Sequence, residues 1–423
     1  MTAAEPTVPT SSDAGITARG ATGVGIASLI AAASGYGVLV LAAKVLTRPE
    51  NADFLSFWGL VFFLFGTLGG LQSEVTRSVH VARTRATPTG GRPGVPVLAA
   101  SLAVGAVGAV LALVTAPWWA GAFLGPSSTA LVVLVAAAVV AFSGHTAMTG
   151  SFAGRGQWTS YARLVGAEAL MRLSLAVVLT VLGAGSVGLH VATGAAAGTW
   201  LLFTVSSRIR GVRHQRSADH GRAFVAGAVQ AMIGAASSAA LLVGFPVLLR
   251  VTTPAATYAL AAPLILAVQL TRAPLLIPLN AYQGVAITHF LNHRDQGARP
   301  LLRIAAVIAA VGGVGAVAAA LVGPWIMTVV LGAGYRVPPL VLGALTVTAA
   351  LLALLTLTGS ATLALGRHRA FAAGWLAATV CSAAALLAPG DLSTRVVASL
   401  AIGPLVGIVV HVIGMRRGLR AHG

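Results

Sequence analysis

Residues 104–110 (VGAVGAV), with Pro117-Trp118 after them, decide the fold of this chain because the same pattern returns 207 residues later. The second copy reads VGGVGAV at residues 311–317 and is followed by Pro324-Trp325. The same offset relates Arg92-Pro93 to Arg299-Pro300, Leu124-Gly125 to Leu331-Gly332, and Arg210-Gly211 to Arg417-Gly418. We therefore expect two copies of one unit. Internal duplication in an apolar chain is typical of transporters.

The composition places the chain in a membrane. Hydrophobic residues make up 57% of the 423 residues and charged residues only 9%, with a mean hydropathy of +0.90. Such a chain has too few polar side chains to cover a water-soluble surface. A hydrocarbon core about 30 Å thick needs about 20 apolar residues per helix. The sequence predicts spans at residues 20–46, 54–79, 95–118, 129–151, 164–182, 187–205, 224–249, 258–277, 302–327, 340–365, 371–387 and 396–415.

We predict an all-α integral membrane protein with twelve transmembrane helices in two similar six-helix halves. The halves are residues 20–215 and 216–423, and residues 1–19 form a disordered cytoplasmic tail. Arginines lie mainly in the loops on the side of both termini, which places both termini in the cytoplasm. An even number of spans per half gives the copies the same topology, related by a pseudo-two-fold axis along the membrane normal. The near absence of lysine reflects genomic base composition, and we expect a bacterial plasma membrane.

The sequence offers little for catalysis, metals or nucleic acids. The net charge of +18 comes from arginines spread over short loops, so it predicts no nucleic-acid partner. Residues 183–188 (GAGSVG) follow a membrane helix and are interpreted as a turn. His289 and His293 lack the glutamate of an HExxH motif, and Cys381 is the single cysteine. We therefore expect no enzyme activity, no catalytic residue, no metal site and no cofactor.

Charged residues inside the spans are the candidate site, because burying a charge in a membrane is costly. Arg272 lies near the middle of the eighth span, where Pro274 is expected to break helical hydrogen bonding and open a polar site for an anion. Glu168 and Arg172 are four residues apart on the fifth span and are expected to pair on one helix face. That pair either contacts substrate or only sets helix packing.

Two further pairs of charges lie near span ends. Lys44 and Arg250 are near-equivalents in the two halves, at the outer ends of the first helix of each. They either flank one central cavity or reach separately to the outer headgroups. Glu74 and Arg77 lie near the cytoplasmic end of the second span, where a long side chain reaches the headgroups easily.

The chain resembles the polysaccharide-flippase branch of the multidrug/oligosaccharidyl-lipid/polysaccharide exporter superfamily. The resemblance rests on twelve spans in two halves, on a second span that reads FLSFWGLVFFLFGTLGGLQSEVTR at residues 54–77, and on a Gly-Arg turn after the fourth span of each half (Gly154-Arg155, Gly366-Arg367). It implies a V-shaped alternating-access transporter that moves a lipid-linked saccharide, a polyprenyl diphosphate conjugate, to the outer leaflet. By residue type it implies that Arg272, Lys44, Arg77 and Arg250 hold the diphosphate.

Two other functions stay open at this point. A major-facilitator or cation-coupled drug exporter also has six plus six spans, but the loop after the second span lacks the GxxxDRxGR-like pattern. A membrane glycosyltransferase that uses a polyprenyl-phosphate donor would need acids outside the membrane, and Glu50 and Asp53 are the candidates. Membrane lipids and polysaccharide-assembly glycosyltransferases are the expected partners.

Overall fold

The computed structural model describes residues 18–84, 94–125, 128–204, 214–292 and 299–420. Most of the predicted tail, the repeat positions at residues 92–93 and 210–211, and the side chains of His289 and His293 lie outside the described residues. The helices are α1 (Ala18–Val45), α2 (Arg48–Thr84), α3 (Val97–Leu124), α4 (Ser128–Gly154), α5 (Trp158–Val181), α6 (Gly185–Ala195), η1 (Ala196–Thr199), α7 (Trp200–Phe203), α9 (Gly221–Leu242), α10 (Phe245–Val251), α11 (Ala255–Tyr258), α12 (Ala262–Asn292), α13 (Arg299–Leu331), η4 (Ala333–Tyr335), α14 (Pro339–Ala364), α15 (His368–Leu386) and α16 (Leu392–Arg420).

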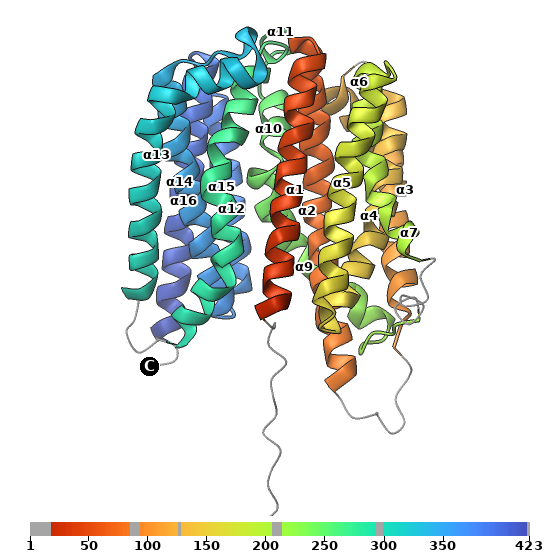
Figure 1. The fold of residues 1–423 in the computed structure, drawn as a ribbon. Coiled ribbons are helices and arrows are strands. Elements are labelled where there is room, and N and C mark those ends of the chain that lie inside the picture. Colours follow the sequence, from red (N-terminus) through yellow and green to blue (C-terminus); the bar gives the residue numbers. More distant parts are fainter. Residues whose placement is uncertain (1–17, 85–93, 126–127, 205–213, 293–298, 421–423) are drawn as a thin grey trace, which may run out of the picture.

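Among the described residues, twelve helical segments are long and apolar enough to cross a membrane, which confirms the predicted fold class. The arrangement is two bundles side by side (Figure 1). Helices α1 to α7 form one bundle and α12 to α16 form the other, with α9 to α11 between them. The predicted boundary between residues 215 and 216 lies in the segment before α9 and stays a prediction.

Two ends of the bundle are distinguished by the direction of the chain. Helix α1 begins and α16 ends at what we call the terminal end, the lower end in Figure 1. The opposite end, where α1 ends and α11 lies, is the distal end. By the arginine distribution the terminal end is expected to face the cytoplasm.

The seventh predicted span is broken rather than continuous. Helix α9 ends at Leu242, and α10 begins at Phe245 with Pro246 in its first turn. A proline has no backbone N–H, so Pro246 cannot donate to the carbonyl of Leu242 four residues before it. The sequence expectation of one helix over residues 224–249 was therefore wrong, and proline explains the break.

The eighth predicted span is longer than expected. Helix α12 runs from Ala262 to Asn292 and passes through both Pro274 and Pro278. The break expected beside Arg272 is therefore not in its own helix. It lies in the neighbouring α9 and α10 pair.

The repeat positions occupy equivalent places in the two halves. Pro117 lies inside α3, and Pro324 lies inside α13. Each helix ends at the leucine before a glycine with positive φ, Gly125 at 72° and Gly332 at 108°. A left-handed backbone at the end of a helix favours glycine because glycine has no Cβ. A Leu-Gly pair therefore ends the equivalent helices α3 and α13.

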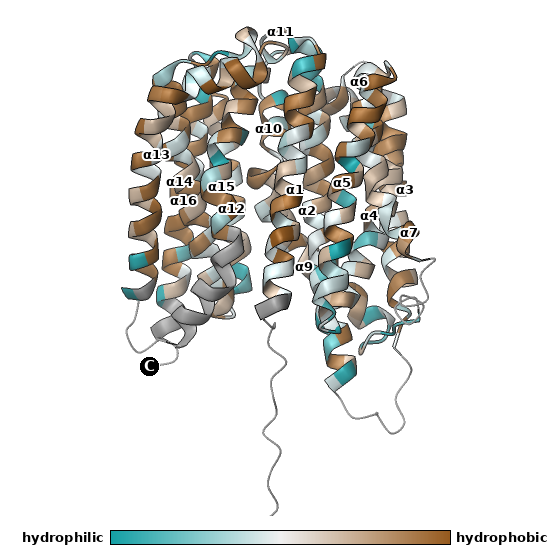
Figure 2. Ribbon diagram, in the orientation of Figure 1, coloured by the Kyte–Doolittle hydropathy of each residue, from teal (hydrophilic) through white to brown (hydrophobic). Residues whose placement is uncertain are grey.

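Burial separates central helices from lipid-facing ones. In α2, 67% of the most apolar stretch is buried inside the protein, against 11% in α13. Figure 2 colours most of α13, at the outer edge of its bundle, as apolar. Val314 and Leu321 of this helix are exposed. Because lipid tails solvate these side chains, an exposed apolar helix face is expected in a membrane.

The halves approach closely through glycines of α2. A Cβ on Gly66 would come within 2.8 Å of the Ala239 side chain, and one on Gly70 within 2.4 Å of the Ala231 backbone in α9. Small residues allow helix backbones to pack closely in membranes. The contact between α2 and α9 is therefore fixed by residue size.

Candidate functional site

A cavity of about 1320 Å³ lies between the halves at the terminal end. Its walls come from the C-terminal part of α2, the first part of α9 and the start of α15. Val225, Val229 and Ile233 give α9 an exposed apolar face along it. The volume exceeds the range of about 300–1,000 Å³ that is usual for small-molecule pockets, so the cavity has room for a large ligand.

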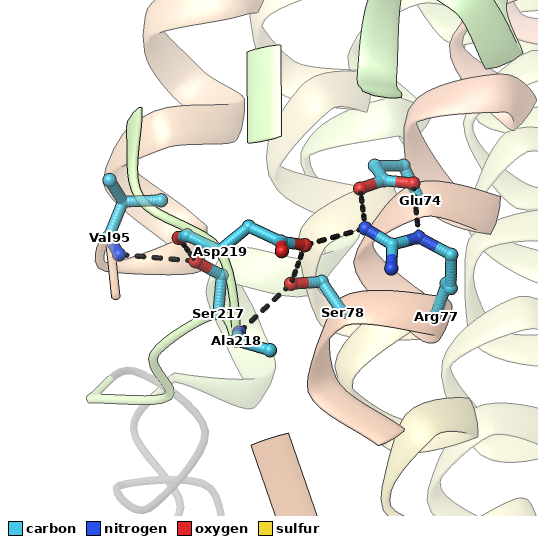
Figure 3. A network of polar contacts seen from close by, with 7 residues as sticks. All are labelled: Glu74, Arg77, Ser78, Val95, Ser217, Ala218 and Asp219. Carbon is cyan, nitrogen blue, oxygen red and sulfur yellow. Dashed lines mark hydrogen bonds and ion pairs between the residues drawn. The ribbon is translucent and has the colours of Figure 1, made fainter. Parts of the chain in front are cut away.

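Arg77 lines this cavity, and its charge is already shared with two carboxylates (Figure 3). Its Nε donates to Glu74 Oε2 at 2.8 Å and its Nη2 to Glu74 Oε1 at 2.5 Å. The same Nη2 lies 2.6 Å from Asp219 Oδ2, in the segment that leads into α9. Glu74 is buried, whereas half of the Arg77 side chain is exposed. Arg77 is therefore accessible but largely neutralised.

The same network fastens the segment before α9 to the first half of the chain. Ala218 donates its backbone N–H to Ser78 Oγ at 3.0 Å, and the Ser217 N–H donates to the Val95 carbonyl at 2.9 Å. The Val95 N–H donates to Ser217 Oγ at 3.1 Å in return (Figure 3). The entry to the second half is thus tied to α2 and to the segment just before α3.

Arg222 and Arg369 are the other arginines on the cavity wall. Arg222 lies in the first turn of α9 and Arg369 in the first turn of α15, and both are exposed. Neither belongs to an ion pair among the residues that the structure describes. These two arginines, rather than Arg77, present free positive charge to the cavity.

Arg272 has a different place from the one that the sequence suggested. Its side chain is buried, and its Nη1 donates to the carbonyls of Leu241 at 3.1 Å and Leu242 at 3.2 Å. Its guanidinium also lies over the Phe245 ring at 5.6 Å from the centroid. These carbonyls are the acceptors freed where α9 ends, and a cation is stabilised by the partial negative charge there. Arg272 therefore caps the broken helix and does not line the cavity between the halves.

Glu168 and Arg172 do pair on α5, inside the first half. Both side chains are buried, and the guanidinium lies 4.8 Å from the centroid of the Phe62 ring and 5.9 Å from that of Trp58. The predicted ion pair exists, but it does not line the cavity between the halves. Its surroundings are those of a packing element between α2 and α5.

The distal end is closed by contacts between the halves. Asn51 donates from Nδ2 to the hydroxyl of Tyr335 at 2.8 Å, and both residues are buried. The Tyr258 hydroxyl donates to the Ala52 carbonyl at 3.1 Å. Burial raises the pKa of both tyrosines, so their hydroxyls keep their protons. The two halves therefore meet at this end through two hydrogen bonds of buried tyrosine hydroxyls, one that accepts from Asn51 and one that donates to Ala52.

Lys44 and Arg250 both lie toward this closed end, away from the cavity. Arg250 forms an ion pair with Asp53, donates from Nε to the Ala122 carbonyl at 3.0 Å and lies over the Tyr258 ring at 4.9 Å. Lys44 is exposed in the last turn of α1. In this conformation Arg250 holds the halves together, and neither cation lines the cavity described above.

The two acids considered for an enzyme both have structural partners. Glu50 Oε2 accepts from the backbone N–H of Thr47 at 2.9 Å and from its hydroxyl at 2.7 Å. The glutamate thereby reaches back across the first turn of α2, as in a capping box. Asp53 is engaged by Arg250.

Sequence reasoning missed Arg222, Arg369, Asp219, Asn51 and Tyr335. Each lies in or beside a loop, where polar residues are common and a polar residue by itself does not indicate a functional site. Only the packing of α2, α9 and α15 brings the first three to one cavity and its border.

No protein family model matches the chain. Its sequence is 38% identical over 395 residues to the uncharacterized protein Rv3630 of Mycobacterium tuberculosis, covering 93% of this chain and 91% of that protein. It is 38% identical over 410 residues to the uncharacterized protein Rv1510 of the same species, covering 96% and 94%. The chain belongs to the family of these proteins. Each alignment spans more than nine-tenths of the chain.

Solved structures share the fold of this chain. An inward-facing multidrug resistance MATE family transporter of the MOP superfamily aligns with a TM-score of 0.63 at 14% identity, covering 94% of this chain and 96% of that one. An outward-facing structure described in the same way gives 0.66 at 15%, covering 96% and 97%. A MOP superfamily transporter from Pyrococcus furiosus, described as having a binding pocket of reverse polarity, gives 0.64 at 15%, covering 95% and 94%. The chain therefore has the fold of these MATE transporters.

Proposed function

We propose that this protein is a membrane transporter that exposes the cavity between its halves alternately to the two sides. The observation that carries the proposal is the asymmetry of the bundle. The cavity lies at the terminal end, whereas buried contacts such as Asn51 to Tyr335 close the distal end. Two halves that enclose a cavity at one end and are closed by buried contacts at the other suit a rocking motion.

The cavity chemistry favours an anionic substrate with an apolar part. Arg222 and Arg369 offer guanidinium groups, which bind phosphates bidentately and stay protonated. The exposed face of α9 beside them is apolar. A lipid-linked saccharide joined through a diphosphate combines both features, and its head group cannot cross hydrocarbon unaided. We propose this substrate class, moved from the terminal-end leaflet to the other.

Within this proposal the arginines have different tasks. Arg222 and Arg369 make the first contact with the anion. Arg77 joins them by exchanging a carboxylate partner for the substrate, which is feasible because its side chain is half exposed. Arg272 maintains the helix break and contacts no substrate in this conformation.

The test uses a strain that lacks the protein. Lipid-linked saccharide is quantified on each membrane leaflet after wild type, Arg222→Gln/Arg369→Gln or Arg155→Gln is restored at matched membrane levels. The proposal expects build-up on the cytoplasmic leaflet, corrected by wild type and by Arg155→Gln. The double variant should fail. Arg155 is the matched control because it follows α4 at the terminal end and does not line the cavity. Unaltered leaflet amounts in the deletion strain would remove this substrate class.

Export of small molecules is the second candidate. It is favoured by the fold, because the solved neighbours include multidrug resistance MATE transporters. Efflux of a cationic dye from the same strains distinguishes the two. Dye efflux that depends on the protein and is not lowered by Arg222→Gln/Arg369→Gln would support drug export, since removing arginines that repel a cation cannot weaken its binding.

A further inference from the structure

A second cavity, of about 690 Å³, lies between α1 and α5 at the terminal end. Small and apolar residues form most of its wall, including Gly23, Ala27, Ala162 and Gly166. Gly166 is buried, yet a Cβ added to it would meet no atom within 4 Å. Small residues on both helices make room for this groove between them.

The groove has the depth of one membrane leaflet. Its α1 wall runs from Gly20 to Ile30, and its α5 wall runs from Thr159 to Leu170. Ten residues of helix rise about 15 Å, which is half of a hydrocarbon core about 30 Å thick. Both helices begin at the terminal end, so the groove starts near that surface and reaches about the midplane.

Polar groups are confined to the shallow end of the groove. Arg163 and the Thr159 hydroxyl lie in the first turns of α5 and are exposed. Arg163 belongs to no ion pair among the residues that the structure describes. The deeper wall carries Ile30 and Leu170. The arginine at headgroup depth matches the phosphate of a phospholipid, and the apolar groove below it matches an acyl chain.

We propose that this groove binds one anionic phospholipid of the terminal-end leaflet. The phosphate lies against Arg163 and Thr159, and one acyl chain runs between α1 and α5. Arginine suits the phosphate because it donates several hydrogen bonds in a fixed plane. The site is separate from the cavity between the halves and does not rest on the proposed transport function.

The experiment is native mass spectrometry of the purified full chain, titrated with dioleoyl phosphatidylglycerol or dioleoyl phosphatidylcholine. Wild type should retain the anionic lipid in preference to the zwitterionic one. Arg163→Gln should weaken phosphatidylglycerol binding by about tenfold, the loss expected for one charge-assisted contact. Gly166→Leu should weaken binding of both lipids because it fills the groove. Its thermal unfolding is measured to show that the variant folds.

A control variant places the site. Arg155→Gln removes a terminal-end arginine that lines neither cavity. It should bind phosphatidylglycerol as wild type does. Equal binding of the two lipids by wild type, or unchanged binding in Arg163→Gln, would overturn the proposal.

Two further outcomes would assign the groove to another occupant. Competition by inorganic phosphate alone, at concentrations that leave phosphatidylcholine bound, would indicate a phosphate site rather than a lipid site. A dimer in the spectra that Gly166→Leu abolishes would assign the groove to a second copy of the chain. Either result contradicts a lipid-filled groove.

Discussion

Replacing Tyr335 by phenylalanine should open the distal end more often. The change removes the hydroxyl that accepts from Asn51 Nδ2 at 2.8 Å and leaves that buried amide without its partner. Losing one partner of a buried hydrogen bond costs about 1–3 kcal/mol. In a distal-open state water can satisfy Asn51, so the cost falls on the closed state alone. A shift of about 1–2 kcal/mol changes the ratio of the two states by about 5- to 30-fold.

Thiol labelling measures this shift. Ala52 is fully buried at the distal contact, so Ala52→Cys in a Cys381→Ala background reports opening to a membrane-impermeant maleimide. Tyr335→Phe should accelerate labelling by the same factor as the population change. Tyr161→Phe is the matched control, because its hydroxyl accepts from Gln72 within one half. Equal labelling rates in the parent and in Tyr335→Phe would refute the reasoning, as would the same acceleration in the control.

Three further predictions concern stability and are checked by thermal unfolding of the purified protein. Arg272→Met should lower the free energy of unfolding by about 1–3 kcal/mol, because two buried carbonyls lose their donor. Arg272→Lys should restore part of that loss. Glu168→Gln or Arg172→Met alone should cost about 3–5 kcal/mol, since each leaves a buried charge unpaired. The double variant should cost less than the sum, and additive losses would contradict the coupling. Gly70→Ala should destabilise the contact of α2 with α9, because the new Cβ would lie 2.4 Å from the Ala231 backbone. A variant as stable as wild type would show that α2 and α9 can move apart without cost, which would contradict this prediction.

Several elements of the fold were predictable because a membrane leaves few alternatives. Length and hydropathy identified twelve spans, since each spanning segment must satisfy its backbone within a helix. The Pro-Trp repeat located α3 and α13, which end at equivalent glycines. Pro246 in the sequence also indicates the break after α9. It lies within a long apolar run, so hydropathy alone predicts one continuous helix there.

The candidate site was only partly predictable because burial depends on neighbours. Glu168 and Arg172 were found as a pair, since four residues along one helix bring two side chains together. The sequence placed Arg272 in a span, but its carbonyl partners belong to another helix. Arg222 and Arg369 gave no signal, because an arginine at the start of a helix is ordinary beside a membrane surface.

The sequence by itself determined that the chain spans a membrane with twelve helices and repeats one unit. These properties follow from composition and from spacing along the chain, which need no knowledge of neighbours. Tertiary structure alone decided which charges remain free. Arg77 is neutralised by Glu74 and Asp219, Arg250 by Asp53, and Arg272 is engaged at a helix end. The state of a charge is set by the groups within a few ångströms of it, and packing brings those groups from distant parts of the chain.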